Sequence, residues 1–154
     1  MKLTYLPKDD SVIKIIATCT YNEWLRSNPK ASVERMTSIL SSRVESTTVP
    51  LTIVAFDENG APIGFANLTK TDMQTRTDLT PWMGGVYVSP EFRGKGIGSA
   101  ICKRIEEEAR RLGFSKAYLV TKDKQNLYSR LGWKTISVEQ YNGMEVTVME
   151  LSIL

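Results

Sequence analysis

The sequence predicts a single domain of mixed α/β class, and three observations support this prediction. The chain has 154 residues, which is enough for one domain and few for two. Stretches with the period of strands alternate with stretches that have the period of helices. No linker, internal repeat or low-complexity segment interrupts this pattern. We therefore expect residues 1–154 to form one domain, with 42% hydrophobic residues to build its core.

The N-terminal third is predicted to form one strand and two helices. Residues 2–6 form a short strand that ends at Pro7. A helix follows from about Val12 to Arg26, and its N-cap is Asp9, Asp10 or Ser11. Ser32 caps the second helix, which places four apolar residues on one face. These residues are Val33, Met36, Ile39 and Leu40.

The middle of the chain is predicted to contribute three strands. Residues 51–56 and 63–68 pair as a hairpin, because Glu58-Asn59-Gly60 between them is a turn sequence. Residues 71–80 are polar and predict a loop. Residues 82–88 are apolar and rich in residues with high β propensity, so they predict a central strand.

The C-terminal half begins with the strongest helical pattern. Its apolar stripe recurs at steps of four and three, and Gly113 follows as a stop signal. The stripe consists of Ile97, Ile101, Ile105, Ala109 and Leu112.

A short strand, a short helix and a hairpin complete the chain. Residues 117–120 predict the strand, and residues 126–131 predict the helix, which ends at Gly132. Residues 133–141 and 144–153 predict two strands joined by Asn142-Gly143. This dipeptide favours a two-residue hairpin turn, in which both residues need positive φ.

Composition excludes several function classes. The net charge of +3 permits an anionic ligand. It does not indicate a nucleic-acid binder, because such proteins usually carry a concentrated basic face. The chain has no histidine, which removes every Ser-His or Cys-His nucleophile pair and the usual zinc ligand. Cys19 and Cys102 have no metal or disulfide spacing. We expect a cytoplasmic protein without a metal, without a nucleic-acid partner and without membrane attachment, since no apolar run reaches the length of a span.

The stretch VSPEFRGKGIG at residues 88–98 contains more glycine than a turn requires. It joins the predicted central strand to the long helix. The first turn of a helix has unpaired N–H groups and a partial positive charge, and glycines let an anion approach them. Arg93 and Lys95 add positive charge. The pattern predicts a phosphate or diphosphate site, although the glycines alone would also suit a simple chain reversal.

Two common nucleotide-binding motifs do not fit this stretch. A P-loop requires glycine five residues before Gly94, where Ser89 stands, and Ser or Thr after the lysine, where Gly96 stands. A dinucleotide fingerprint requires G-x-G-x-x-G in a repeated βαβ pattern, but the spacing here is G-x-G-x-G.

The sequence from Val86 to Ala100 resembles the acetyl-coenzyme A motif of the GNAT (GCN5-related) N-acetyltransferases. A second motif of that family, a tyrosine just before an LGF or LGW segment, resembles Leu127 to Trp133. The order of predicted elements is also similar over nearly the whole chain. The resemblance implies a mostly antiparallel central sheet with one splayed parallel pair and flanking helices. It also implies acetyl-CoA as co-substrate.

The resemblance assigns candidate site residues. Tyr128 is the candidate general acid, and its alternative role is packing beside Leu127 and Leu131. Backbone groups of Val86, Tyr87 and Val88 are expected to contact the pantetheine arm, and the two valines also fit plain strand core. The remaining cofactor-binding positions belong to the glycine loop and the first helical turn. They are Arg93, Gly94, Lys95, Gly96, Ile97, Gly98 and Ser99.

Other roles stay open at the level of sequence. The predicted central strand has no acid, so the general base is undefined. The nearby carboxyl groups, each expected to be a surface charge, are Glu23, Asp72, Asp78 and Glu91. Thr121, Asn126 or neither contacts the cofactor. Gly84-Gly85 either leaves room for the acceptor or marks a β-bulge. Two roles are open for Tyr21, Trp24 and Trp82. They could form an aromatic wall for a cationic acceptor, or they could pack in the core as ordinary aromatic residues.

The resemblance implies direct transfer of an acetyl group to a primary amine on a small molecule, peptide or protein. One alternative is a non-catalytic acyl-CoA sensor of the same fold. Another alternative is a phosphate- or nucleic-acid-binding module that uses only the basic loop. The lack of a wider basic surface argues against this alternative. The oligomeric state is expected to be a monomer or a homodimer.

Overall fold

The computed structural model describes residues 1–154 and confirms the mixed α/β class. Seven strands form one sheet in the order β1-β2-β3-β4-β5-β7-β6, and only the β4–β5 pair is parallel. The strands are β1 (Lys2–Tyr5), β2 (Leu51–Phe56), β3 (Pro62–Thr69), β4 (Trp82–Val88), β5 (Lys116–Thr121), β6 (Lys134–Tyr141) and β7 (Met144–Ser152). The helices are α1 (Asp10–Thr20), α2 (Val33–Ser41), α3 (Ile97–Arg111) and α4 (Gln125–Arg130).

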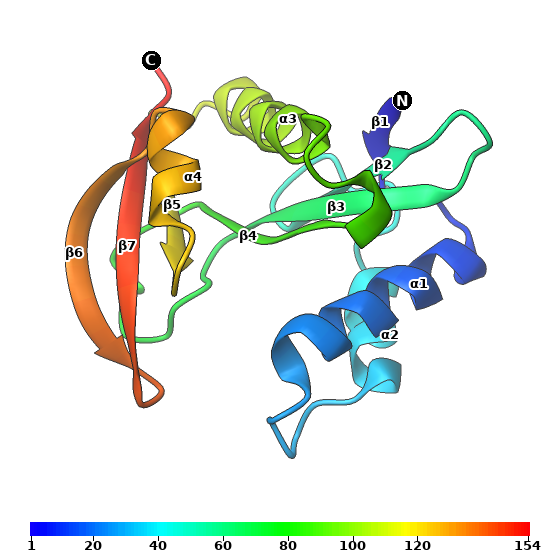
Figure 1. Ribbon diagram of the computed structural model, residues 1–154, viewed down its shortest axis with the longest axis horizontal. Coiled ribbons are helices and arrows are strands. Elements are labelled where there is room, and N and C mark those ends of the chain that lie inside the picture. The colour runs from blue at the N-terminus through cyan, green and yellow to red at the C-terminus, as the bar shows by residue number, and fades with distance from the viewer.

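Helices cover both faces of the half of the sheet that contains β1 to β4. Figure 1 shows α3 on one face and α1 with α2 on the other. The predicted stripe of α3, including Ile101, Ile105 and Ala109, is buried in a core cluster of 19 residues. On the opposite face a second cluster of 8 residues holds the apolar residues of α1 and Leu40 of α2. The amphipathic periods seen in the sequence therefore set the two layers.

The predicted first helix differs in its last turn from the observed one. Asp9 caps α1, because its carboxylate accepts hydrogen bonds from the backbone N–H groups of Ser11 and Val12. The helix then widens into a π-helical turn over Tyr21–Leu25. A π-turn adds one residue per turn and shifts the following side chains around the helix axis. The 3.6-residue period of the sequence predicts no such turn.

The sheet opens between β4 and β5. These strands share one aligned pair, Trp82 with Tyr118, and Figure 1 shows the two halves of the sheet separating beyond it. A β-bulge in the β3–β4 pairing accompanies this opening, since Phe65 faces Tyr87 while Asn67 faces Gly84. Gly85 occupies the bulge with φ +60°, a conformation that glycine adopts without steric cost.

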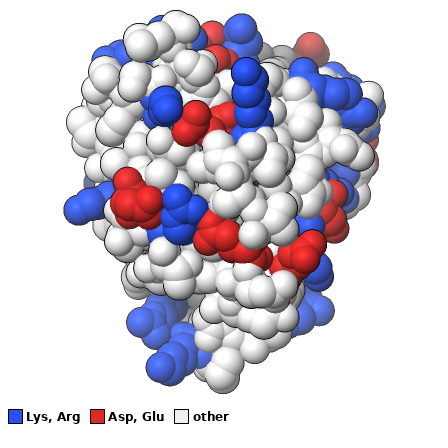
Figure 2. All heavy atoms as spheres, turned by 90° about the vertical axis from the view of Figure 1, so that its left-hand side faces the viewer, with Lys and Arg blue, Asp and Glu red and all other residues white.

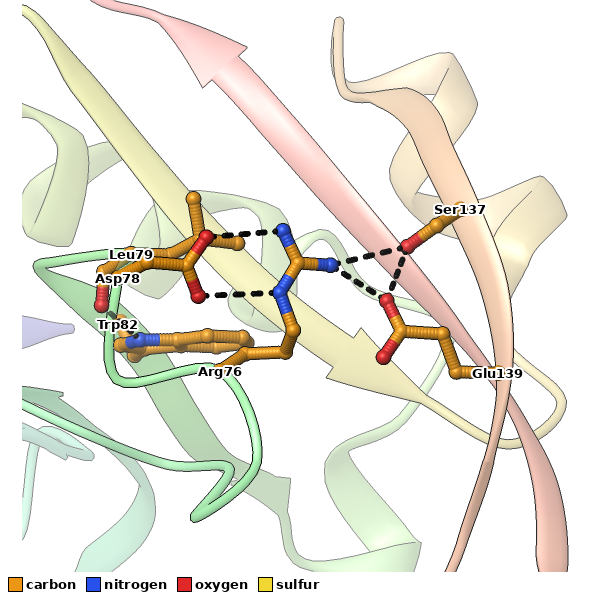
Figure 3. Close-up of polar contacts among 6 residues, drawn as sticks. All are labelled: Arg76, Asp78, Leu79, Trp82, Ser137 and Glu139. Atoms are coloured by element: carbon orange, nitrogen blue, oxygen red, sulfur yellow. Dashed lines mark hydrogen bonds and ion pairs between the residues drawn. The ribbon is translucent and has the colours of Figure 1, made fainter.

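The polar loop over residues 70–81 is anchored to the far half of the sheet. Met73 is fully buried in a small core cluster with Trp82 and Tyr118. Figure 3 shows the Arg76 guanidinium between Asp78 of the same loop and Ser137 and Glu139 of β6. Its Nη1 atom lies 2.5 Å from Glu139 Oε2, and its Nε atom lies 3.1 Å from Asp78 Oδ1. The loop therefore has a defined position in spite of its polar sequence.

Charges of both signs are dispersed over the surface at the β6 end of the sheet. Figure 2 shows Lys and Arg intermixed with Asp and Glu on this face, with uncharged residues between them. Such a face has no field of one sign to attract a polyanion. None of the helices is both long enough and apolar enough to span a bilayer.

Glu108 connects α3 to the edge of the sheet. Its side chain is buried and accepts a hydrogen bond from the Tyr5 hydroxyl at 2.7 Å. Arg104 and Arg111 donate to the same carboxylate at 3.1 and 2.8 Å. Desolvation raises the pKa of Glu108, but the bonds from Tyr5, Arg111 and Arg104 outweigh it and leave the pKa below its ordinary value. The charged form is therefore stabilised in the folded state.

We predict that Glu108→Ala lowers the free energy of unfolding by about 3 kcal/mol, because it leaves two cations without their buried partner. The Glu108 contribution is present above the pKa of the unfolded chain and is lost as the pH falls through the lowered pKa of the folded state. Urea unfolding at pH 7 and pH 3 measures both effects. Glu106→Gln, which breaks the exposed pair with Arg110, is the control and should change stability by less than about 0.5 kcal/mol. Equal stability of Glu108→Ala and the wild type would contradict this role.

Candidate active site

The glycine loop presents its backbone to solvent at the start of α3. Gly94 and Gly96 have φ values of +76° and +81°, and no atom lies within 4 Å of a Cβ placed on either residue. Gly96 is the N-cap of α3, and no side chain caps the first turn. The N–H groups at this helix terminus are therefore unpaired and accessible, which is the arrangement that binds phosphate groups.

The two cations of the loop lie against neighbouring aromatic rings. Arg93 donates from Nε to the Val88 carbonyl oxygen at 2.8 Å, and its guanidinium lies 5.6 Å from the centre of the Tyr87 ring. Lys95 lies 5.5 Å from the centre of the Phe92 ring. Arg93 thus braces the loop against β4 as well as adding charge. This bracing is a tertiary contact that the residue pattern does not reveal.

A cleft of about 370 Å³ connects the glycine loop to the open edge of β4. It lies between β4, the start of α3 and α4. Of the residues expected in the site, all but Lys95 line this cleft. They are Val86, Tyr87, Val88, Arg93, Gly94, Gly96, Ile97, Gly98, Ser99 and Tyr128. The structure thus brings the two sequence motifs together across the opening between β4 and β5.

Six further residues line the cleft that the sequence does not assign to the cofactor site. They are Glu23, Phe92, Cys102, Lys124, Leu127 and Leu131. Lys124 directly precedes α4 and adds a cation opposite the glycine loop. Thr121 and Asn126 do not line the cleft: the Thr121 hydroxyl accepts from the Lys124 N–H at 3.0 Å, and Asn126 is exposed.

Tyr128 is buried, with only 9% of its surface exposed. Its ring packs edge-on to Trp133 at 6.4 Å between centres. Burial, and secondarily the neighbouring Cys102, raise the pKa of the Tyr128 phenol. The hydroxyl therefore stays protonated at neutral pH. The same side chain thus packs in the core and lines the cleft.

Cys102 is the one thiol in the cleft lining. Burial raises the pKa of the Cys102 thiol to about 12. A thiol with this pKa is protonated at neutral pH and is a poor nucleophile, because the thiolate is the reactive form.

Of the two roles left open by the sequence, the structure shows the β-bulge, which Gly85 forms. The space beside each glycine is occupied by a polar side chain. A Cβ on Gly84 would lie 2.7 Å from Asp72 Oδ2, and a Cβ on Gly85 would lie 2.7 Å from Asn67 Nδ2. Trp24 reaches within 4.0 Å of the same Gly85 position and is 46% exposed. Asp72, Asn67 and Trp24 thus lie along Gly84 and Gly85, and we call the surface that they border the slot.

Hydrogen bonds hold Asn67 in this slot. Its Nδ2 group donates to the Gly84 carbonyl at 3.3 Å, and its Oδ1 atom accepts from the Thr52 hydroxyl at 2.6 Å and from Arg43 at 3.3 Å. Asp72 is an exposed residue, although its carboxyl oxygens lie against Gly84. Desolvation by the surrounding protein raises the pKa of Asp72 to about 6, and the positive charge of Arg43 opposes this rise.

The other aromatic and acidic candidates lie elsewhere or are already paired. Trp82 is fully buried against Tyr118 and does not contribute to an aromatic wall. Asp78 pairs with Arg76, and Glu91 is an exposed residue of the loop after β4. Glu23 is exposed at the edge of the cleft.

A larger open depression of about 730 Å³ lies at the other end of the sheet. Its lining includes Tyr5, Glu45 and Asp57, and it has no helix N-terminus or tyrosine motif. No three Cys, Asp or Glu side chains gather where they would hold a metal ion.

Comparisons with known proteins agree with this geometry. Residues 10–133 match the model of the acetyltransferase (GNAT) family. No protein with a curated description matches the sequence. An aminoglycoside 6'-N-acetyltransferase crystallised with coenzyme A is similar in structure, with TM-score 0.78, 16% identity and coverage of 100% of this chain and 98% of the other. A variant of a Vibrio cholerae spermidine N-acetyltransferase has TM-score 0.72, 17% identity and coverage of 99% and 95%.

A third solved structure is a putative acetyltransferase from Salmonella typhimurium with its cofactor acetyl-CoA. It has TM-score 0.70 and 18% identity, and the match covers 100% of this chain and 95% of the other. Identities at this level show a shared fold.

Proposed function

The chain belongs to the GNAT acetyltransferase family, which transfers acetyl from acetyl-CoA, and we propose that its acceptor is a primary amine on a small molecule, peptide or protein. The observation that carries this proposal is the convergence of the glycine loop, the open edge of β4 and Tyr128 in one cleft. Two of the similar structures are named for amine acceptors, an aminoglycoside and spermidine.

The residues of the cleft fit coenzyme A. Its volume of about 370 Å³ is within the range of small-molecule sites. The N–H groups from Gly94 to Ser99 would hold the diphosphate, and Lys124 adds charge on the opposite wall. Val86, Tyr87 and Val88 lie on the strand edge that β5 leaves unpaired, so their backbone groups would hold the pantetheine arm. When bound, acetyl-CoA supplies an activated acyl group whose leaving group is a thiol.

The site favours direct attack by the amine. The thiol of Cys102 is protonated at neutral pH, and the chain has no histidine to activate a serine or cysteine. Alignment of the amine with the thioester can supply roughly 7–11 kcal/mol of the barrier reduction. The rigid β4 edge and the anchored glycine loop provide that alignment.

Tyr128 is proposed to act as the general acid. As the amine nitrogen forms its bond to the acyl carbon, the C–S bond breaks and its electron pair moves to sulfur. The phenol donates its proton to that sulfur and regains one from solvent or from the acylated nitrogen. An ammonium acceptor loses two protons overall, one goes to the thiol, and one is released. The raised pKa of Tyr128 keeps the phenol in the donating form.

We predict that Gly94→Asp weakens coenzyme A binding at least tenfold. The substitution places a carboxylate beside the diphosphate, where repulsion between unit charges amounts to about 1–4 kcal/mol at 4 Å. Titration calorimetry with coenzyme A measures the effect. Gly60→Asp is a matched control, because Gly60 also has positive φ, +81°, and open space around its Cβ position. It should bind coenzyme A as the wild type does. Equal weakening in both variants would contradict the location of the site.

Tyr128→Phe should lower kcat by roughly 10²-fold or more, the usual contribution of a positioned general acid. Because the phenyl ring keeps the packing against Trp133, affinity for coenzyme A should stay within about twofold of wild type. Steady-state kinetics over pH 6–10 test this assignment. In the wild type the raised pKa predicts no loss of activity from phenol ionisation up to pH 10. An unchanged kcat over that range would refute the role of Tyr128.

The proposed reaction is tested by thiol release from acetyl-CoA in the presence of spermidine, kanamycin and a tripeptide with a free N-terminus. At least one of these amines should increase the rate of thiol release well above hydrolysis, with a mass increase of one acetyl group in the acceptor. Tight coenzyme A binding without transfer to these or any further amines would identify a sensor in place of an enzyme.

A further inference from the structure

We propose that Asp72 is the general base, which receives a proton from the ammonium group of the acceptor in the slot over Gly84. This assignment rests on the proposed function, because it concerns the amine side of the same reaction. Asp72 lies outside the family motifs and outside the strand that carries the cleft, and its sequence context predicts a surface charge.

Contact with Gly84 places the carboxylate at the reacting edge of β4. The Asp72 Oδ2, Cγ and Oδ1 atoms lie 2.7, 3.1 and 3.4 Å from the position of a Cβ on Gly84. A side chain at residue 84 would therefore exclude the carboxylate. Gly84 is two residues from Val86, whose backbone lines the cleft. An ammonium group bound at the Asp72 carboxylate would therefore lie close to a thioester held beside Val86.

The loop that carries Asp72 is held on three sides. Met73, the next residue, is fully buried. The Gln74 N–H donates to the Tyr141 hydroxyl at 3.0 Å. The Arg76 guanidinium then ties the loop to β6 through Glu139, as Figure 3 shows. A base must lie within hydrogen-bond reach of its proton, and these anchors keep the carboxylate over Gly84 without any direct bond to it.

The opposite wall of the slot suits a cation. Trp24 lies beside Gly85 with 46% of its surface exposed and packs edge-on to Tyr87 at 6.4 Å. An indole face attracts ammonium groups. Asn67 points its amide to the same bulge, but both of its polar atoms are engaged with Thr52, Arg43 and Gly84. Asp72 is therefore the acidic group of the slot that no hydrogen bond or ion pair occupies.

The electrostatics of the slot favour proton transfer. The pKa of Asp72 is raised to about 6 by desolvation, and Arg43, at the end of α2, is the one charged group that acts against this. Gly84, beside which the carboxylate lies, carries no charge. A carboxylate of pKa 6 takes a proton from an amine of pKa near 10.4 about 100-fold more readily than one of ordinary pKa. It is still ionised at neutral pH.

The proton balance follows from these positions. The Asp72 carboxylate takes one proton from the ammonium nitrogen, whose lone pair then forms the bond to the acyl carbon. The C–S electron pair moves to sulfur, which is protonated by Tyr128. As the amide forms, the nitrogen passes its second proton to the Tyr128 phenolate, directly or through solvent, and Asp72 releases its proton to solvent. Two ammonium protons thus become one thiol proton and one released proton.

Asp72→Asn tests the proposal with the amine that gives the highest wild-type rate among spermidine, kanamycin and the tripeptide. In the wild type, kcat/KM should fall below a pKa near 6. At pH 7 the variant should be 10²–10⁴-fold slower, and its rate should rise about tenfold per pH unit up to the pKa of the amine. The gap between the two proteins therefore narrows at high pH. Loss of a residue with only a structural role would leave the inflection near pH 6 in place.

Gly84→Ala tests the position of the carboxylate without removing it. The φ of Gly84 is outside the left-handed region, so alanine suits the backbone, and its Cβ must displace the end of the Asp72 side chain. It should lower kcat/KM at pH 7 at least tenfold in the wild type and have no further effect in the Asp72→Asn background. Additive losses in the double variant would contradict the proposal.

Two further carboxyl variants and a folding measurement complete the test. Glu107→Gln removes an exposed, unpaired charge on α3 and should match the wild type. Glu23→Gln should retain the limb near pH 6. The melting temperature and coenzyme A affinity of Asp72→Asn should be no lower than wild type, since the native state disfavours the charged carboxyl.

Loss of the acidic limb in Glu23→Gln, or its persistence in Asp72→Asn, would overturn the assignment of Asp72 and leave the proposed acetyl transfer intact. Absence of transfer to any amine by the wild type would overturn both.

Discussion

The parting of β4 from β5 is the constraint on which the rest of the structure depends. A single aligned pair, Trp82 with Tyr118, joins the two halves of the sheet. The bulge at Gly85 then turns β4 away. On the side that faces β5, backbone groups from Val86 to Val88 have no strand partner, although β3 pairs with β4 on the other side. An unpaired, half-buried strand edge requires another source of hydrogen bonds. The same parting brings the N-terminus of α3 and the Tyr128 motif to opposite walls of one cleft.

Polar networks keep this open region fixed from outside. Glu108 ties α3 to β1 through Tyr5, and Arg76 ties the loop before β4 to β6. Both networks satisfy their charged groups. Within the site, by contrast, polar groups lack protein partners. The Asp72 carboxylate has no ion pair. The Tyr128 side chain and the first turn of α3 line the cleft. The buried Arg43 Nε atom also has no hydrogen-bond partner. Groups in this state are available to ligands at a cost in folding stability.

Local patterns were sufficient to predict most of the fold. Strand and helix periods predicted every strand of the sheet, and the order of strand, glycine loop and helix predicted an anion site whose residues the structure brings to one cleft. The π-helical turn after Thr20 and the bracing of Arg93 on the Val88 carbonyl escaped prediction, because both depend on packing. Asp72 escaped for the same reason: its position depends on a contact with a glycine twelve residues away, and its loop is polar in sequence. Tyr128 was identified only through a family motif, since its pattern alone fits core packing.

A crystal structure of the protein with coenzyme A tests the central claim most directly, because the claim concerns where the sheet opens and what occupies the opening. We expect the diphosphate on the N–H groups from Gly94 to Ser99, the pantetheine arm against Val86 to Val88, and the sulfur next to the Tyr128 hydroxyl, with the slot over Gly84 left free for the acceptor. Coenzyme A bound in the depression beside Tyr5, or a pantetheine arm lying over Gly84 on the face of Asp72, would contradict the account.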